Sequence, residues 1–207
     1  ANNYISAFKD KGFYIDVGCY HPIKHSLTHK LYKMGWSGIN IDISKESIDL
    51  FNTFRSKDKN LNLGISTKNG FQDAFFEKKI STISSLKPDY LEKFPNNKKK
   101  FVRKIKTLTI NDLFEKNEIT EVDFLKIDCE GLDTSIIKTI NFEKYKINFL
   151  SVEFLDPYAD FINKKNNDIK SVHELFFSSE MYNVLKKNFE LLDHDQFAFL
   201  LVNKKIY

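Results

Sequence analysis

Short apolar stretches alternate with longer amphipathic ones along most of this chain. The apolar stretches are four to eight residues long and bounded by turn residues, which is typical of strands. They cover residues 12–17, 38–43, 61–65, 122–127 and 147–154. Segments with helical periodicity cover residues 23–34, 44–54, 109–116, 132–140 and 171–188. Gly35 is a plausible stop for the first helix, and Ser44 a plausible N-cap for the second.

Alternating strands and helices predict a fold class. It is α/β, with a mainly parallel sheet and helices on both faces. Residues 189–192 and 197–202 would form a C-terminal hairpin, which adds an antiparallel strand at one edge. The segment 66–106 has no clear period and contains Pro88 and Pro95, so we expect it to be irregular. No repeat or linker divides the chain, and we predict a single domain over residues 1–207.

Acidic residues stand at the ends of several predicted strands. In open parallel sheets, ligands bind outside the carboxyl ends of the strands. Asp42 follows Asp16 by 26 residues, which is where an acid holds ribose hydroxyls in dinucleotide-binding folds. The glycine-rich phosphate loop is absent after Gly18, so a nucleoside with a short tail fits better than a pyrophosphate. The alternative is that these acids are only turn residues.

A second acidic pair follows the fourth predicted strand. Asp128 and Glu130 lie two residues apart at a strand-to-helix turn. One carboxylate could accept a proton from a hydroxyl nucleophile while the other orients a ligand. Capping of the next helix is the alternative.

Three histidines follow the first strand at intervals of four residues: His21, His25 and His29. Pro22 suits the first position of a helix, which places His21 just outside it. The cluster lacks the His-Glu-x-x-His or Cys-x-x-Cys patterns of zinc sites. A structural role, substrate contact or acid–base work, and a metal site all stay open. His21 is the best acid–base candidate, since the ordinary histidine pKa of about 6.5 suits proton transfer near neutrality.

Composition narrows the function classes. The net charge is +4, but only Arg55 and Arg103 among the 32 basic residues are arginines. Arginine is the side chain that reads bases and phosphates with two hydrogen bonds, so sequence-specific nucleic-acid binding is disfavoured. The basic run 98–106 is either a solvated segment or a binding site for phosphates. Lys24 is a second candidate for binding phosphates. No apolar run is long enough for a membrane span, and two cysteines do not make a disulfide framework. We expect free thiols and a cytoplasmic protein.

Several ordered strings in the chain resemble the FkbM family of S-adenosylmethionine-dependent methyltransferases. They are FYIDVG at 13–18, YHP at 20–22, S-x-T at 26–28, GWSGINID at 35–42, GIS at 64–66, ST at 81–82, TL at 107–108, DFLKIDCEG at 123–131 and VE at 152–153. The chain departs from the family at Leu27, Cys19 and Cys129. The chain also begins close to its first strand, which leaves open whether a further N-terminal segment belongs to the site.

The resemblance implies a Rossmann-like methyltransferase fold with seven strands and specific site residues. Residues implied for the cofactor S-adenosyl-L-methionine are Asp16, Val17, Gly18, Cys19, Tyr20, Asp42, Ile43, Gly64 and Asp128. Those for the acceptor are His21, Lys24, Ser26, Thr28 and Glu153, and segment 71–106 would shape its site. Those for catalysis are His21, Asp128 and Glu130. A Mg²⁺ ion, if present, would be held by Asp128, Glu130 and Glu153 through oxygen ligands.

The expected activity is methyl transfer to a sugar hydroxyl. The acceptor would be a nucleotide-activated sugar or a surface-polysaccharide precursor, without nucleic-acid partners. Whether the protein is a homodimer stays open. Alternatives are a methyltransferase of RNA, protein or a small metabolite, a non-catalytic nucleoside-binding module, and a histidine metal enzyme.

Overall fold

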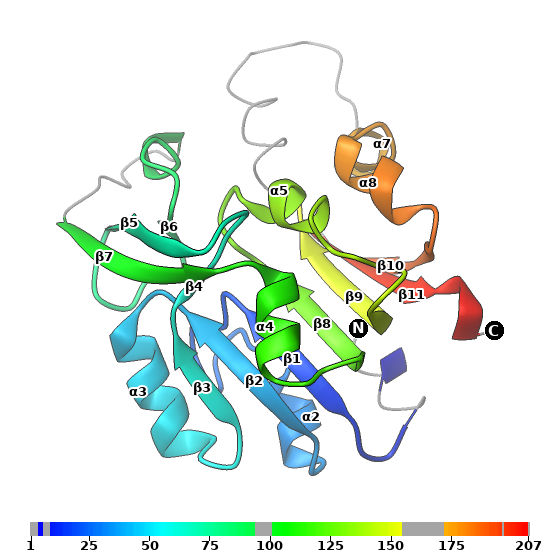
Figure 1. Ribbon diagram of the computed structural model, residues 1–207, viewed down its shortest axis with the longest axis horizontal. Coiled ribbons are helices and arrows are strands. Elements are labelled where there is room, and N and C mark those ends of the chain that lie inside the picture. Colours follow the sequence, from blue (N-terminus) through cyan, green and yellow to red (C-terminus); the bar gives the residue numbers. More distant parts are fainter. Residues whose placement is uncertain (1–3, 6–8, 94–100, 155–171, 196, 207) are drawn as a thin grey trace.

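The computed structural model describes residues 4–5, 9–93, 101–154, 172–195 and 197–206. Its main feature is a seven-stranded sheet with the order β10-β11-β9-β8-β1-β2-β3 (Figure 1). The strands are β1 (Phe13–Val17), β2 (Ser37–Asp42), β3 (Lys59–Asn62), β8 (Glu121–Ile127), β9 (Lys146–Glu153), β10 (Phe189–His194) and β11 (Ala198–Asn203). Strand β11 runs antiparallel to both of its neighbours, and the other pairings are parallel. The mainly parallel seven-stranded sheet with a C-terminal edge hairpin is therefore confirmed.

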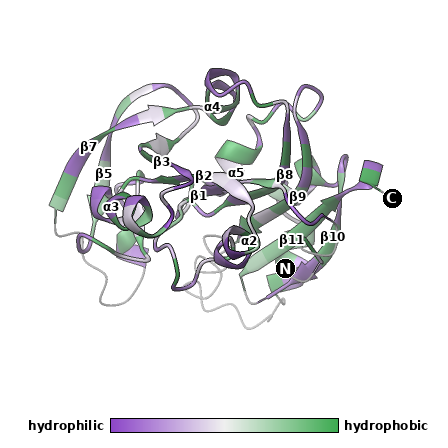
Figure 2. Ribbon diagram, turned by 90° about the horizontal axis from the view of Figure 1, so that it is seen from below, coloured by the Kyte–Doolittle hydropathy of each residue, from purple (hydrophilic) through white to green (hydrophobic). Residues whose placement is uncertain are grey.

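Helices cover both faces of this sheet. They are α2 (His29–Lys33), α3 (Lys45–Phe54), α4 (Ile110–Lys116), α5 (Asp133–Ile137), α7 (Val172–Phe177) and α8 (Glu180–Leu185), with short 3-10 turns η1 (Leu91–Lys93) and η2 (Lys204–Ile206). Side chains alternate along β1, so Ile15 and Val17 enter a large core with α4, α5 and α8, while Tyr14 enters a smaller core with α2. Figure 2 shows α2 on the opposite side of the sheet from α4 and α5. Within the described residues, no helix has the length and apolar character that a membrane span requires.

A second, four-stranded sheet corrects the prediction of an irregular segment 66–106. Its order is β4-β7-β5-β6, formed by Gly64–Ile65, Phe101–Leu108, Gly70–Phe76 and Ser84–Ser85. Ala74, Phe76 and Ile105 form its small core, and Phe76 stacks on Phe101. Lysines alternate with apolar residues on β7. In the sequence this segment therefore looks like a charged run rather than a strand. Pro95 and residues 98–100 of the basic run lie outside the described residues.

The predicted strand 61–65 is also divided between the two sheets. Strand β3 ends at Asn62, and Gly64 begins β4 in the second sheet. The chain thus passes from one sheet to the other next to the carboxyl end of β2.

Three predicted helices are shorter than expected, and α5 covers only Asp133–Ile137 of the predicted helix 132–140. Helix α2 begins only at His29, because residues 22–28 form turns in which His25 has a positive φ of 54°. The predicted helix 171–188 is interrupted between α7 and α8. Ser179 adopts an extended conformation there, and its hydroxyl accepts a hydrogen bond from the Tyr182 amide. The N-caps Ser44 and Thr109 of α3 and α4 have the same geometry.

Candidate active site

A cavity that opens to solvent lies at the carboxyl ends of β1, β2 and β8. The second sheet and the loop that follows β5 form its outer wall. Its lining residues come from the β1 turn (Val17, Gly18, Cys19, Tyr20), from His25, from β2 and its exit (Ile41, Asp42, Ile43), from 63–65, from the loop and β6 (Ser81, Thr82, Ser84, Leu86), and from β8 onward (Lys126, Asp128, Cys129, Glu130, Leu132). Its floor is therefore the strand edge at which ligands bind in open parallel sheets.

The turn after β1 has a tightly constrained backbone. Gly18 has a φ of +73°, and a Cβ atom there would lie 1.7 Å from the carbonyl oxygen of Asp128. Its N–H donates to the Ile41 carbonyl at 2.9 Å. Only glycine fits this position, since any side chain would force β1 and β8 apart. Tyr20 also has a positive φ, of 55°, and is held by a bond to β2.

The acceptor of that hydrogen bond is the carboxylate of Asp42, whose side chain faces the cavity. Its carboxylate accepts hydrogen bonds from the Tyr20 amide at 2.8 Å and from the Ser44 amide at 2.7 Å. Burial raises the pKa of Asp42 to about 6, against the pull of these two donors. Two donors leave free lone pairs on the carboxylate, so it can still accept hydrogen bonds from a ligand's hydroxyls.

Asp16 lies beneath the cavity rather than on its wall. It is 1% exposed, accepts a hydrogen bond from the Thr28 hydroxyl at 2.7 Å, and pairs with the Lys126 ammonium at 3.4 Å. Lys126 also contacts Asp128 at 3.1 Å and donates to the Gly18 carbonyl at 3.0 Å. Burial opposes the charge on Lys126, but Asp128 and Asp16 outweigh it and hold its pKa above the usual value. The ammonium thus ties the β1 turn to the end of β8.

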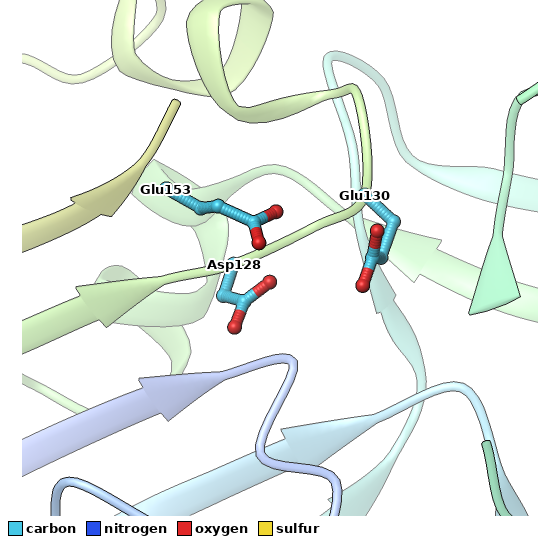
Figure 3. A group of neighbouring side chains, drawn as sticks. All are labelled: Asp128, Glu130 and Glu153. Atoms are coloured by element: carbon cyan, nitrogen blue, oxygen red, sulfur yellow. The ribbon is translucent and has the colours of Figure 1, made fainter. Parts of the chain in front are cut away.

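Three carboxylates meet where β8 and β9 end. Asp128, Glu130 and Glu153 each place an oxygen within 4.8 Å of the others, and their side chains converge in Figure 3. Burial, followed by the charge of Asp128, raises the pKa of Glu130 well above its usual range. The same two causes, in the same order, raise the pKa of Glu153 to about 11.

The loop that carries this cluster is held from below. Asp133 accepts hydrogen bonds from the amides of Cys129 at 2.8 Å and Gly131 at 3.2 Å. The Ser85 hydroxyl donates to the Glu130 carbonyl at 2.7 Å, so the second sheet also braces the loop. Glu130 itself has a positive φ of 50°. A left-handed conformation at a bulky residue persists only where its surroundings enforce it, as they do here.

A second cavity adjoins the first. It is lined by Ile23, His25, Ser26, Leu27, Lys126, Ile127, Asp128, Ser151, Glu153, Asp195, Phe197 and Ala198. His25, Lys126 and Asp128 line both cavities. A group bound in the first cavity could therefore meet a group bound in the second beside the Asp128 carboxylate.

The structure separates the residues predicted for the acceptor. Ser26 and Glu153 line the second cavity. Thr28 is fully buried and bonded to Asp16, and Lys24 is exposed and lines neither cavity. His21 also lines neither; its Nδ1 accepts hydrogen bonds from the amides of residues 23 and 24, both at 3.1 Å.

Arg55, at the end of α3, explains the conformation of the turn 22–28. It is 1% exposed, and its guanidinium donates to the Pro22 carbonyl and to the hydroxyls of Ser26 and Thr28. These bonds replace the first turns of the predicted helix. The three histidines consequently do not share a helix face, and His25 alone among them reaches the cavities.

Sequence reasoning missed several residues of the site. Arg55 could have been found, because it is one of two arginines in a lysine-rich chain. Lys126 lies inside the FkbM-like string 123–131, and Asp133 follows shortly after it. Nothing in the spacing of these two residues assigns them a role. Ser84, Leu86 and Phe197 could not be found, since only the tertiary fold brings them to the cavities.

Comparison with known proteins identifies the family. The family model described as the Methyltransferase FkbM domain matches residues 16–191, most of the 207-residue chain. The chain belongs to the FkbM methyltransferase family. Its members' shared activity makes this FkbM protein an S-adenosylmethionine-dependent methyltransferase, as the sequence predicted. No curated protein matches the chain.

A solved structure is similar to this FkbM domain at low identity. It is an O-methyltransferase from Bacillus cereus in complex with SAH, with 9% sequence identity and a TM-score of 0.45. The match covers 98% of this chain and 80% of that chain. A similarity this distant adds nothing about the acceptor, which has to be argued from the cavities.

Proposed function

We propose that this FkbM protein transfers a methyl group to a hydroxyl of a sugar. The observation that carries the proposal is the shared wall of the two cavities. Asp128 stands on that wall, between a cavity suited to a nucleoside and a cavity lined by polar side chains.

The first cavity fits the cofactor S-adenosyl-L-methionine. Asp42 offers carboxylate oxygens for ribose hydroxyls, and Ile43, Leu63 and Leu86 provide apolar surface for a base. Gly18 lets the backbone turn beneath the ligand. When bound, the cofactor supplies a methyl group on a positively charged sulfur, whose bond to carbon breaks as the acceptor oxygen takes the methyl group.

In the second cavity, the side chains suit a neutral, hydroxyl-rich acceptor. Ser26, Ser151 and Asp195 can bond hydroxyl groups, and Phe197 offers an apolar face to sugar carbons. Acidic groups outnumber lysines among the described lining residues, which disfavours phosphates there. We therefore favour a sugar or the sugar end of a surface-polysaccharide precursor, with any nucleotide outside this cavity.

Asp128 is the proposed base. Its carboxylate borders both cavities, so it can hold the acceptor hydroxyl and take its proton as the oxygen gains the methyl group. Lys126 fixes the orientation of that carboxylate from below. His25 also lines both cavities and carries an ionisable imidazole ring. It therefore replaces His21 as the histidine to test.

The test is a transfer assay with isotopically labelled methyl donor. Panels of neutral sugars, nucleotide sugars, small metabolites and RNA serve as acceptors. Labelled product with sugars, lost in Asp128→Asn and kept in His21→Gln, is the expected result. Product with RNA or small metabolites only would overturn the acceptor class. Cofactor binding without transfer to any acceptor would favour the non-catalytic module.

The cytoplasmic location is part of this proposal and rests on the two free cysteines, Cys19 and Cys129.

A further inference from the structure

The carboxylate cluster at the ends of β8 and β9 contains a buried oxygen for which the described part of the chain offers no hydrogen-bond partner. Glu130 is only 8% exposed, and its Oε2 atom has no hydrogen-bond partner among the described residues. The Tyr90 hydroxyl lies beside the same carboxyl, but Oε2 still lacks a hydrogen-bond donor among the described residues. A buried oxygen without a donor is costly, so this position calls for a proton or a cation.

The fold holds Glu130 in this position. Its backbone has a positive φ, its carbonyl is held by Ser85, and Gly131 next to it leaves no space for a Cβ beside the Tyr90 ring, at 2.5 Å. The carboxylate consequently points toward those of Asp128 and Glu153 (Figure 3).

The nearby lysine does not neutralise the whole cluster. Lys126 is shared between Asp16 and Asp128, and the structure gives no ion pair to Glu130 or Glu153 within its described residues. Three carboxylates therefore converge on less than one positive charge, at the point where the second cavity meets the first.

We propose that Asp128, Glu130 and Glu153 form a binding site for a divalent cation of the hard, oxygen-preferring class. Two oxygens on opposite sides of Ca²⁺ lie about 4.8 Å apart, and those around Mg²⁺ or Mn²⁺ about 4 Å apart, given their usual bond lengths. The observed separations, all within 4.8 Å, accommodate such an ion with small side-chain movements. Three protein ligands leave further coordination positions for oxygens from the second cavity.

The role of this cation rests on the proposed function. An ion held by Asp128 and Glu153 would face the acceptor cavity, where adjacent hydroxyls of a sugar could bind it in place of water. Binding of the ion would fix which hydroxyl approaches the methyl group and would make that hydroxyl easier to deprotonate. Occupation of the site itself does not depend on this role.

The direct test is a titration of the chelator-treated, desalted full chain with Mn²⁺ alone, with free Mn²⁺ counted by electron paramagnetic resonance. We expect one saturable site per chain, for which Mg²⁺ competes. Glu130→Gln and Glu153→Gln should each weaken binding at least about tenfold, since loss of a group that merely orients a metal ligand already costs about tenfold or more. The matched control Glu143→Gln removes an exposed carboxylate and should bind as the wild type does.

Two outcomes would overturn the site. One is the absence of saturable binding by folded wild-type protein; the other is equal binding by Glu130→Gln. The circular dichroism spectrum of metal-free Glu130→Gln should match that of the wild type, which separates loss of a ligand from misfolding. A parallel titration with S-adenosylhomocysteine keeps the hypotheses apart: no cofactor binding would contradict the proposed function, whereas no Mn²⁺ binding would contradict only the cation site.

Discussion

At the scale of single residues, the charge of Asp42 determines how well the first cavity can accept hydrogen bonds from a ligand's hydroxyls. Its pKa of about 6 in the folded protein exceeds the ordinary value of 3.8. The folded state therefore holds this proton more tightly than the unfolded chain does, and the contribution of Asp42 to stability decreases as the pH rises from about 4 to about 6. Ligand affinity should change in the opposite direction, because only the ionised carboxylate keeps its full capacity to accept hydroxyl hydrogen bonds.

We therefore predict that affinity for S-adenosylhomocysteine falls below about pH 6, by up to about tenfold per pH unit. Calorimetric titrations between pH 5 and 8, values chosen to bracket about pH 6, measure this effect. Asp42→Ala should bind weakly at every pH and show a flat profile over that range. A wild-type profile as flat as that of the variant would remove Asp42 from the ribose site.

Lys126 provides a second prediction at this scale. Replacing it by Met leaves Asp16, 1% exposed, without its cation. The free energy of unfolding should fall by about 3–5 kcal/mol, since breaking a buried ion pair strands the remaining charge. Urea denaturation measures the loss. Lys144→Met, which breaks an exposed pair with Glu115, is the control and should have a much smaller effect.

The sequence located several residues that the structure brings to the two cavities. Strand ends with acids pointed to Asp42, Asp128, Glu130 and Glu153, and the structure gathers the last three into one cluster. Asp16 was assigned to the cofactor by the same reasoning, yet its side chain faces Thr28 and Lys126 below the cavity. Whether an acid at a strand end faces the ligand or the core depends on the face of the sheet and on partners far away in sequence.

At the scale of elements, the turn 22–28 forms one wall of both cavities and depends on α3. Arg55 ties this turn to the end of α3 through the Pro22 carbonyl and the hydroxyls of Ser26 and Thr28. The helical pattern predicted for 23–34 fails because these tertiary bonds satisfy the backbone and side chains in another conformation. Periodicity reports only local preference, and a buried guanidinium can override it.

Arg55→Lys tests this dependence. A lysine cannot serve three acceptors in the planar arrangement of a guanidinium, so we expect the free energy of unfolding to drop by about 2 kcal/mol or more. Acceptor turnover should decline more than cofactor binding, because the turn supplies Ser26 to the second cavity. Arg103→Lys, at a part-exposed pair with Glu46, should lose less stability. Equal losses in both variants would contradict a special role for Arg55.

The break between α7 and α8 supports another prediction. Ser179→Ala removes the N-cap of α8 and should lower the free energy of unfolding by about 1 kcal/mol. Ser178→Ala, one residue earlier and exposed, should cost less. Thermal or urea denaturation of the pair measures the difference. No difference between the two would mean that the hydroxyl of Ser179 does not hold the break.

At the scale of the whole molecule, the main sheet was predictable and the second sheet was not. Apolar strands separated by amphipathic helices predicted the order of layers, and buried residues such as Ile15 and Leu125 bear this out. Strands β5 and β7 of the second sheet pair residues far apart in the sequence, such as Phe76 with Phe101, and β7 carries lysines on its exposed face. Such a pattern resembles a solvated loop until its partner strand is known.

We propose that the edge formed by β1, β2 and β8 binds S-adenosyl-L-methionine, and the proposed methyl transfer depends on that binding. The most direct measurement is a calorimetric titration of the folded chain with S-adenosylhomocysteine, the product form of the cofactor. We predict one site per chain with a dissociation constant on the order of micromolar, strongly weakened in Asp42→Ala. No detectable heat or displacement, in protein shown to be folded by circular dichroism, would contradict the account.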